Sequence, residues 1–101
     1  MAELVAGRQV GHVAAGVVAQ VWRGDARQHN VARVLKTRAV RVHALNDAVA
    51  FDLGRLLAVT GASDVIDAHV ASLGQATGGV VLTSDPDDIR AINPDLTIVC
   101  V

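Results

Sequence analysis

The feature that most constrains this chain is the segment 80–89, where a short β-branched run is followed at once by a helix start. Residues 80–83 predict a buried strand. Pro86 suits the first helical position because its missing N–H would be unpaired there, and two aspartates in the first turn favour the positive end of the helix dipole. Asp85 would then lie at the carboxyl end of a strand, where open α/β sheets bind ligands. A simple capping role for Asp85 is an equally good interpretation.

The remaining segments alternate between strand-like and helix-like periodicity. Residues 1–7 are expected to be the tail of a helix that stops at Gly7, and Ser63 is expected to cap a helix that runs to Ala76. Strands are predicted at 9–13, 39–45, 80–83 and 97–101, and further helices at 14–23, 26–36, 48–59 and 86–92. This alternation predicts a three-layer α/β/α sandwich with a mostly parallel sheet, formed by residues 1–101 as one domain.

Composition excludes several classes of protein. Hydrophobic residues make up 51% of the chain but aromatic residues only 2%, so alanine and valine must do most of the packing. The single cysteine, Cys100, excludes an internal disulfide and a cysteine zinc cage, and the histidines at 12, 29, 43 and 69 show no metal-ligand spacing. No run of about eighteen apolar residues and no signal-peptide pattern is visible, so we expect a cytoplasmic protein with no membrane partner.

A second acidic cluster lies at the start of the helix that precedes the central strand. Asp64 and Asp67 are three residues apart and share one helical face. Asp67 precedes Asp85 by 85 − 67 = 18 residues, which is one helix, a glycine turn and a strand. Two carboxylates about 4 Å apart repel by about 4 kcal/mol at an effective dielectric of about 20, so such a pair holds a cation or a proton. Oxygen ligands favour Mg²⁺ or Mn²⁺. The alternative is that Asp64 caps the helix and Asp67 is merely solvated.

Basic residues are concentrated in one part of the chain. Between positions 23 and 41 lie six of the nine basic residues: Arg23, Arg27, Arg33, Lys36, Arg38 and Arg41. Such a segment is suited to tracking nucleic-acid phosphates, and Arg23 and Arg27 are the predicted contacts. For Arg33 and Lys36 a solvated helix face is the more economical interpretation.

Taken together, these motifs resemble those of a known family. Asp67-Ala68-His69-Val70-Ala71, followed by Leu82-Thr83-Ser84-Asp85, is similar to the Asp-Ala-x-Ile-Ala and Leu-x-Thr-x-Asp signature of PIN-domain ribonucleases, particularly the VapC-type toxins of bacterial toxin–antitoxin pairs. The segment 17–24 resembles the family's second conserved helix. The resemblance implies a parallel sheet of order 3-2-1-4-5 and an endoribonuclease site that uses Mg²⁺ or Mn²⁺. It also implies an antitoxin partner and a homo-oligomer.

The same resemblance assigns roles to individual residues. Asp67 and Asp85 would be the catalytic metal ligands, and four residues would line the cleft: Gln20, Asp64, Thr83 and Ser84. Two of the family's four acids are not matched, because nothing in residues 1–11 supplies the first aspartate and Gln20 replaces the second acid. We therefore expect either a weakened enzyme or a non-catalytic PIN-fold module that binds an antitoxin or a second subunit. A small doubly wound ligand-binding domain is a third possibility.

No segment of the sequence matches the strand that carries the first aspartate in the family. Its place is at the centre of the sheet, between the strand near Val10 and the strand at Val80. Unpaired buried backbone groups there would cost about 1–3 kcal/mol each, against a total stability of about 5–15 kcal/mol. The gap must be filled by a rearranged segment from Ala2 to Val10, by a second copy, or by a longer natural chain, which is the expectation we favour.

Overall fold

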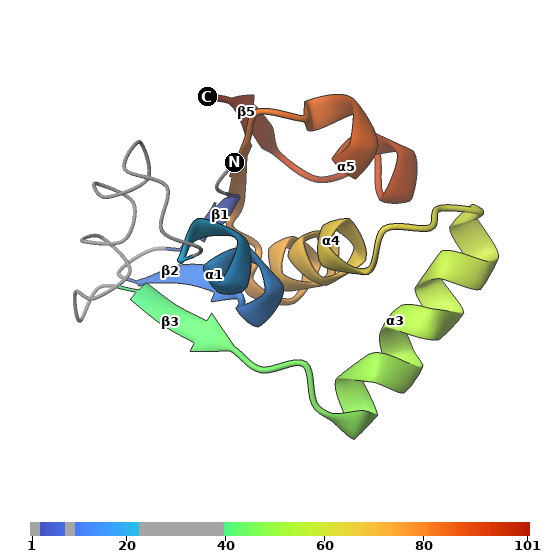
Figure 1. The fold of residues 1–101 in the computed structure, drawn as a ribbon. Coiled ribbons are helices and arrows are strands. Elements are labelled where there is room, and N and C mark those ends of the chain that lie inside the picture. The colour runs from blue at the N-terminus through green and yellow to red at the C-terminus, as the bar shows by residue number, and fades with distance from the viewer. Residues whose placement is uncertain (1–2, 8–9, 23–39) are drawn as a thin grey trace.

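The computed structural model describes residues 3–7, 10–22 and 40–101 of the chain. In these residues, five strands form one sheet and four helices accompany it (Figure 1). The elements are β1 (Leu4–Ala6), β2 (Gly11–Ala14), α1 (Ala15–Val21), β3 (Val40–His43), α3 (Asp47–Thr60), α4 (Val65–Thr77), β4 (Val80–Thr83), α5 (Pro86–Ile92) and β5 (Ile98–Cys100). The expected helix at 26–36 lies outside the described residues.

The sheet is mixed but mostly parallel, with the strand order β3-β2-β1-β4-β5. β2 pairs with β3 and β4 pairs with β5 in parallel, whereas β1 is antiparallel to both of its neighbours. Four strands therefore run in one direction and β1 alone runs against them. The α/β class and the strand order agree with the sequence analysis, and the helices are arranged compatibly with a three-layer sandwich.

The central place in the sheet is filled by the chain's own N-terminal segment. The expectation of a helix tail at residues 1–7 is wrong where the structure describes it, because Leu4–Ala6 is a strand. Glu, Leu and Ala favour helices in isolation, but here the facing edges of β2 and β4 offer backbone hydrogen bonds on both sides. The register pairs Leu4 with Leu82 and Ala6 with Val80. Of the three ways to fill the gap, the rearranged N-terminal segment is the one that the structure adopts.

Gly79, just before β4, allows the backbone of β1 to lie close to that of β4. A Cβ atom on Gly79 would lie 2.6 Å from the carbonyl oxygen of Ala6 and 2.9 Å from Cγ1 of Val5. Contacts below about 3 Å are not tolerated by packed atoms, so the backbones could not lie this close with any larger residue. Val5 itself is buried in the core, 1% exposed.

Helix α4 is the centre of the packing. It lies between the sheet and α3 in Figure 1, and it contacts three strands as well as α3 and α5. A Cβ atom on Gly74 would lie 2.9 Å from Val81, so α4 lies close against the face of the sheet that carries Val81. Val5 and His12 share that face, since paired residues on neighbouring strands point to the same side. At its other end, α4 brings Ile66 against Gly16 of α1.

Side-chain caps and a left-handed glycine define the ends of α3 and the start of α4. The Asn46 side chain caps α3 by accepting the Val49 N–H at 3.0 Å, and Gly61 ends the helix in the left-handed conformation. Of the two caps that the sequence suggested for α4, Ser63 is wrong and Asp64 is confirmed. Asp64, rather than Ser63, accepts the N–H groups of Ile66 and Asp67 at 2.9 and 3.0 Å.

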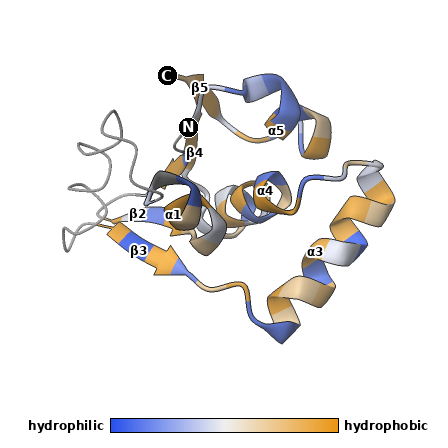
Figure 2. Cartoon of the chain, in the orientation of Figure 1, coloured by the Kyte–Doolittle hydropathy of each residue, from blue (hydrophilic) through white to orange (hydrophobic). Residues whose placement is uncertain are grey.

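The outer helix α3 is less buried than α4. Figure 2 shows hydrophobic residues along much of α3, yet Phe51 is 72% exposed and Val59 86%. In contrast, six residues of α4 are buried: Ala68, His69, Val70, Ala71, Leu73 and Gly74. None of the helices in the described part of the chain is long and apolar enough to cross a membrane.

Candidate functional site

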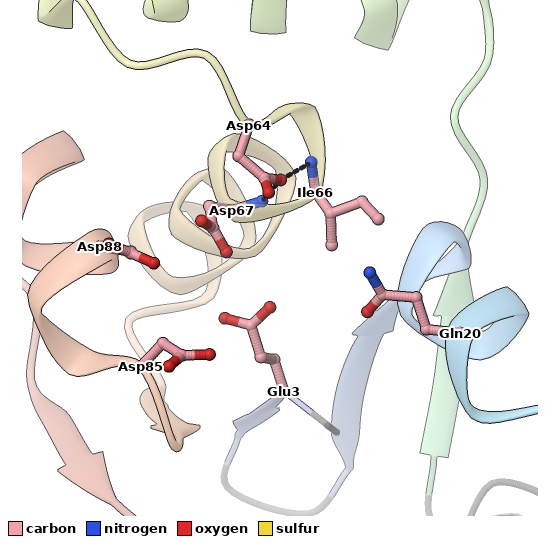
Figure 3. A pocket seen from close by; sticks show the side chains of 7 residues that line it. All are labelled: Glu3, Gln20, Asp64, Ile66, Asp67, Asp85 and Asp88. Carbon is pink, nitrogen blue, oxygen red and sulfur yellow. Dashed lines mark hydrogen bonds between the residues drawn. The ribbon is translucent and has the colours of Figure 1, made fainter. Parts of the chain in front are cut away.

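A pocket of about 220 Å³ lies at the carboxyl end of β4, beside the start of β1. It is lined by Glu3, Gln20, Asp64, Ile66, Asp67, Asp85 and Asp88. Figure 3 shows the carboxylates of Glu3, Asp67, Asp85 and Asp88 pointing toward a common space, with the Gln20 amide on the other side. Five of the seven lining residues are acidic, and the described part of the lining holds no basic residue.

Asp67 and Asp85 are therefore brought together, as the sequence predicted. Asp67 lies in the first turn of α4. Asp85 occupies the position before α5, but its side chain makes no capping hydrogen bond. The contrast with Asp64, whose carboxylate caps α4, argues against a purely capping role for Asp85. Its carboxylate faces the pocket instead.

Glu3 is the acidic residue that the sequence analysis missed. It precedes β1 by one residue, and because β1 is antiparallel to β4, its amino end meets the carboxyl end of β4. Glu3 thus lies opposite Thr83, whose hydroxyl donates to Glu3 Oε2 at 3.2 Å. The expectation that nothing in residues 1–11 supplies a first acid is wrong. The available signal was that Glu3 is the chain's only glutamate and precedes a short apolar run that ends at a glycine.

Thr83 connects two acidic residues from beneath the pocket. It is fully buried, and its hydroxyl oxygen also accepts the Asp85 N–H at 3.0 Å. Thr83 and Ser84 were expected to line the cleft, but neither is among the residues that line this pocket. Ser84 Oγ is buried and has no hydrogen-bond partner within the described residues. Thr83 therefore supports the site without facing its interior.

The electrostatic environment shifts the protonation of two carboxyl groups. Burial, followed by the charge of Asp67, raises the pKa of Glu3 from 4.5 to about 7, although the Thr83 hydrogen bond opposes this shift. Burial and then the charges of Asp64 and Asp88 raise the pKa of Asp67 from 3.8 to about 6. The interaction with Asp67 raises the pKa of Glu3 and that with Glu3 lowers the pKa of Asp67, so Glu3 is the more readily protonated of the two. Close to neutral pH, this pair holds a proton in place of a counter-ion.

The chemistry of the lining suits a hard cation better than any other ligand. Carboxylate oxygens are the preferred ligands of Mg²⁺ and Mn²⁺. Among the described residues, no three histidine, cysteine or acidic side chains are gathered tightly enough to hold an ion directly. Mg²⁺, however, usually keeps several waters and binds through one or two carboxylates. The pocket therefore fits a hydrated ion held by part of the acidic set, with water between the ion and the rest.

The other predicted contacts divide into two groups. Gln20 of α1 and Asp64 line the pocket, as the sequence analysis expected. Gln20 is exposed, and its amide contributes an oxygen but no charge. The predicted RNA contacts Arg23 and Arg27 lie outside the described residues, as does the rest of the basic segment up to Arg38. Arg41 is described, and it is exposed on β3.

Comparison with known proteins adds no further assignment. No protein-family model, curated protein sequence or solved structure matches this chain.

Proposed function

We propose that this chain is a PIN-like, VapC-type toxin domain that cleaves RNA phosphodiester bonds with the help of Mg²⁺ or Mn²⁺. The observation that carries the proposal is the convergence of Glu3, Asp67, Asp85 and Asp88 on one pocket at the carboxyl end of β4. The Asp67 and Asp85 motifs are those that resemble the family, and Glu3 restores an acid where the sequence had appeared to lack one. The strand order agrees with the order that the resemblance implies.

The raised pKa values of Glu3 and Asp67 support a site built for positive charge. Closely spaced carboxylates without a cation destabilise a fold, so their retention in one pocket is typical of functional sites. A divalent ion, when bound, would activate water and neutralise the charge that develops on the phosphate. Asp67 and Asp85 would hold that ion, with Asp88 close enough to share its waters.

Glu3 has a different role in this proposal. With a pKa of about 7 it can both carry and release a proton at the pH of the cytoplasm, which suits a general acid or base. Thr83 fixes the orientation of its carboxyl group through the 3.2 Å hydrogen bond. Gln20 would orient substrate or water from the opposite side of the pocket without adding charge.

The partners follow from the same resemblance. We expect an RNA substrate, an antitoxin protein that covers the site, and a homo-oligomer, all in the cytoplasm. The basic segment 23–41, with Arg23 and Arg27 at its start, would contact RNA phosphates beside the pocket. The non-catalytic interaction module remains the second candidate, because Gln20 stands where the family has an acid.

A metal-dependent RNA cleavage assay separates the two candidates. Asp85→Asn removes one proposed metal ligand, and we expect it to lower the cleavage rate by about 10²-fold or more, as is common when a charge-stabilising group is lost from an active site. Glu3→Gln should lower the rate less and alter its pH profile near neutral pH. Asp52→Asn on the exposed face of α3 makes the same chemical change outside the pocket and should leave the rate unchanged.

Two results would contradict the proposal that this chain is a ribonuclease. Wild type and Asp85→Asn could be equally inactive with Mg²⁺ and with Mn²⁺, which would leave the interaction module as the better interpretation. Alternatively, cleavage could persist unchanged in Asp85→Asn, which would indicate a contaminating ribonuclease or a different site.

A further inference from the structure

Two histidines that are 31 residues apart in the sequence meet on one face of the sheet. Nδ1 of His12 lies 2.8 Å from Nε2 of His43, and one of these nitrogens donates a hydrogen bond to the other. The ring centroids are 5.0 Å apart and the planes are tilted by 46°. The rings are therefore not stacked. Instead, Nδ1 of His12 and Nε2 of His43 point toward each other.

The backbone holds this pair in place. β2 and β3 pair in parallel, with His12 opposite Arg41 and Ala14 opposite His43. Side chains alternate between faces along a strand, so His12, Arg41 and His43 all lie on the same face, with His43 one step farther along β3. Gly7 leaves room for the His12 ring, because a Cβ atom there would lie 3.1 Å from its Nε2. Both imidazoles are carried by sheet strands rather than by long loops.

The spacing of the two nitrogens is close to that of a metal-bound pair. Zn–N bonds of about 2.0–2.1 Å at a tetrahedral angle put two ligating nitrogens roughly 3.3 Å apart. The observed separation is 2.8 Å, so a small rotation of either ring is enough to admit an ion. Both side chains are only partly buried, so water can reach the remaining coordination positions.

We propose that His12 and His43 form a binding site for a divalent transition metal of the Zn²⁺ type, with water completing its coordination. Imidazole nitrogen favours such ions over Mg²⁺, which keeps this site chemically distinct from the acidic pocket. The ion replaces the proton of the hydrogen bond between the two rings, and it cross-links β2 and β3 through His12 and His43. The site does not depend on the proposed ribonuclease activity.

Two further features of the described residues bear on this site. Burial, and then the charges of His12 and Arg41, lower the pKa of His43, which favours its neutral imidazole. No three metal-ligating side chains are gathered around one point in the described residues, so these residues supply two ligands, His12 and His43. Two ligands give a weaker site than the three or four of catalytic and structural zinc centres.

The test is a Zn²⁺ titration of the whole chain without a polyhistidine tag, followed by calorimetry and by ¹⁵N NMR of the imidazole rings. Excess Mg²⁺ is present throughout to occupy carboxylates. We expect one Zn²⁺ per chain, with shifts of His12 Nδ1 and His43 Nε2. His12→Gln and His43→Gln should each weaken binding by roughly tenfold or more, because loss of an outer-shell partner alone costs about 10–100-fold. Asp85→Asn, in the acidic pocket, should bind Zn²⁺ as wild type does.

The proposal fails if binding is unchanged in both histidine variants, if the shifted nitrogens belong to other histidines, or if no saturable binding occurs. Where a variant does not fold, the ring-nitrogen shifts of the wild-type protein decide the question alone. Loss of Zn²⁺ binding in Asp85→Asn with the histidines intact would place the ion in the acidic pocket and would also overturn the proposal.

Discussion

The acidic pocket has two walls of different origin. One wall comes from the first turn of α4 and the β4–α5 junction, and it carries Asp67, Asp85 and Asp88. The other comes from β1, a three-residue strand that carries Glu3 at its amino end. The first wall is encoded by short-range patterns within residues 64–88. The second exists only because β1 is inserted between β2 and β4.

The two walls differ in how deeply their carboxylates are buried. Glu3 is 7% exposed and its pKa rises to about 7, mainly through burial. Asp85 and Asp88 are exposed, and they supply charge at the rim. The local motif thus presents Asp85 and Asp88 at the pocket mouth, whereas the buried position of Glu3 depends on the insertion of β1 beside β4.

The largest effect should come from breaking the second wall. Gly79→Ala places a methyl group 2.6 Å from the Ala6 carbonyl oxygen and forces β1 away from β4. We expect a loss of about 1–3 kcal/mol in the free energy of unfolding, as is typical of overpacking. The pKa of Glu3 should also return toward 4.5, which carbon NMR can follow because the chain holds a single glutamate.

Gly54→Ala is the matched control for that substitution. Gly54 lies in the interior of α3 and a Cβ atom there meets nothing within 4 Å. Alanine should stabilise the helix by roughly 0.5–1 kcal/mol and leave the Glu3 signal unchanged. If Gly79→Ala were as stable as wild type, the close β1–β4 contact would not be needed to hold the second wall.

A smaller effect on the free energy of unfolding should appear when the charge of Glu3 is removed but β1 stays in place. The raised carboxyl pKa values mean that the folded state binds protons more tightly than the unfolded chain does. This stabilising contribution is complete below about pH 4 and is lost as pH rises through about 6 to 7. Glu3→Gln cannot ionise, so it should be more stable than wild type at pH 8, by on the order of 1 kcal/mol.

Chemical denaturation at pH 5 and pH 8 measures this effect. Wild type should lose stability over that interval, and Glu3→Gln should lose less. Asp52→Asn on α3 should follow the wild-type pH dependence, since its exposed ion pair with Arg55 contributes little. Parallel pH profiles for wild type and Glu3→Gln would mean that Glu3 ionises as an ordinary surface acid.

The smallest effect should come from changing charge on the first wall alone. Asp64→Asn keeps a side-chain oxygen for the α4 cap, so the free energy of unfolding should change by no more than about 0.5 kcal/mol. The pKa of Asp67 should fall, because the charge of Asp64 is, after burial, the largest cause of its rise. NMR titration of the Asp67 carboxyl carbon measures this change.

The reciprocal substitution Asn46→Asp provides the comparison. It exchanges the same two side chains at the cap of α3, away from the pocket. The pKa of Asp67 should not move in this variant. An unchanged Asp67 pKa in Asp64→Asn would show that burial alone sets the proton affinity of the pocket.

Much of the fold was predictable because its signals are local. The strand at 80–83 and the helix that begins at Pro86 both lie where the sequence predicted them. The approach of Asp67 to Asp85 was also predictable, since one helix and one strand connect them. The prediction failed at Leu4–Ala6, where a helix was expected and a strand is found.

The sequence by itself determined the α/β alternation and the approach of Asp67 to Asp85, because both follow from local periodicity and from the single helix and strand between the two residues. The strand order followed only from the resemblance of the motifs to the PIN-domain family. Only the tertiary structure decided that β1 inserts between β2 and β4, antiparallel to both. This arrangement places Glu3, which lies just before the amino end of β1, in the pocket. It also decided that His12 and His43 meet across β2 and β3. The contact of Glu3 with Thr83 joins residues 80 positions apart and that of His12 with His43 joins residues 31 positions apart, and the local sequence carries no energetic preference for either.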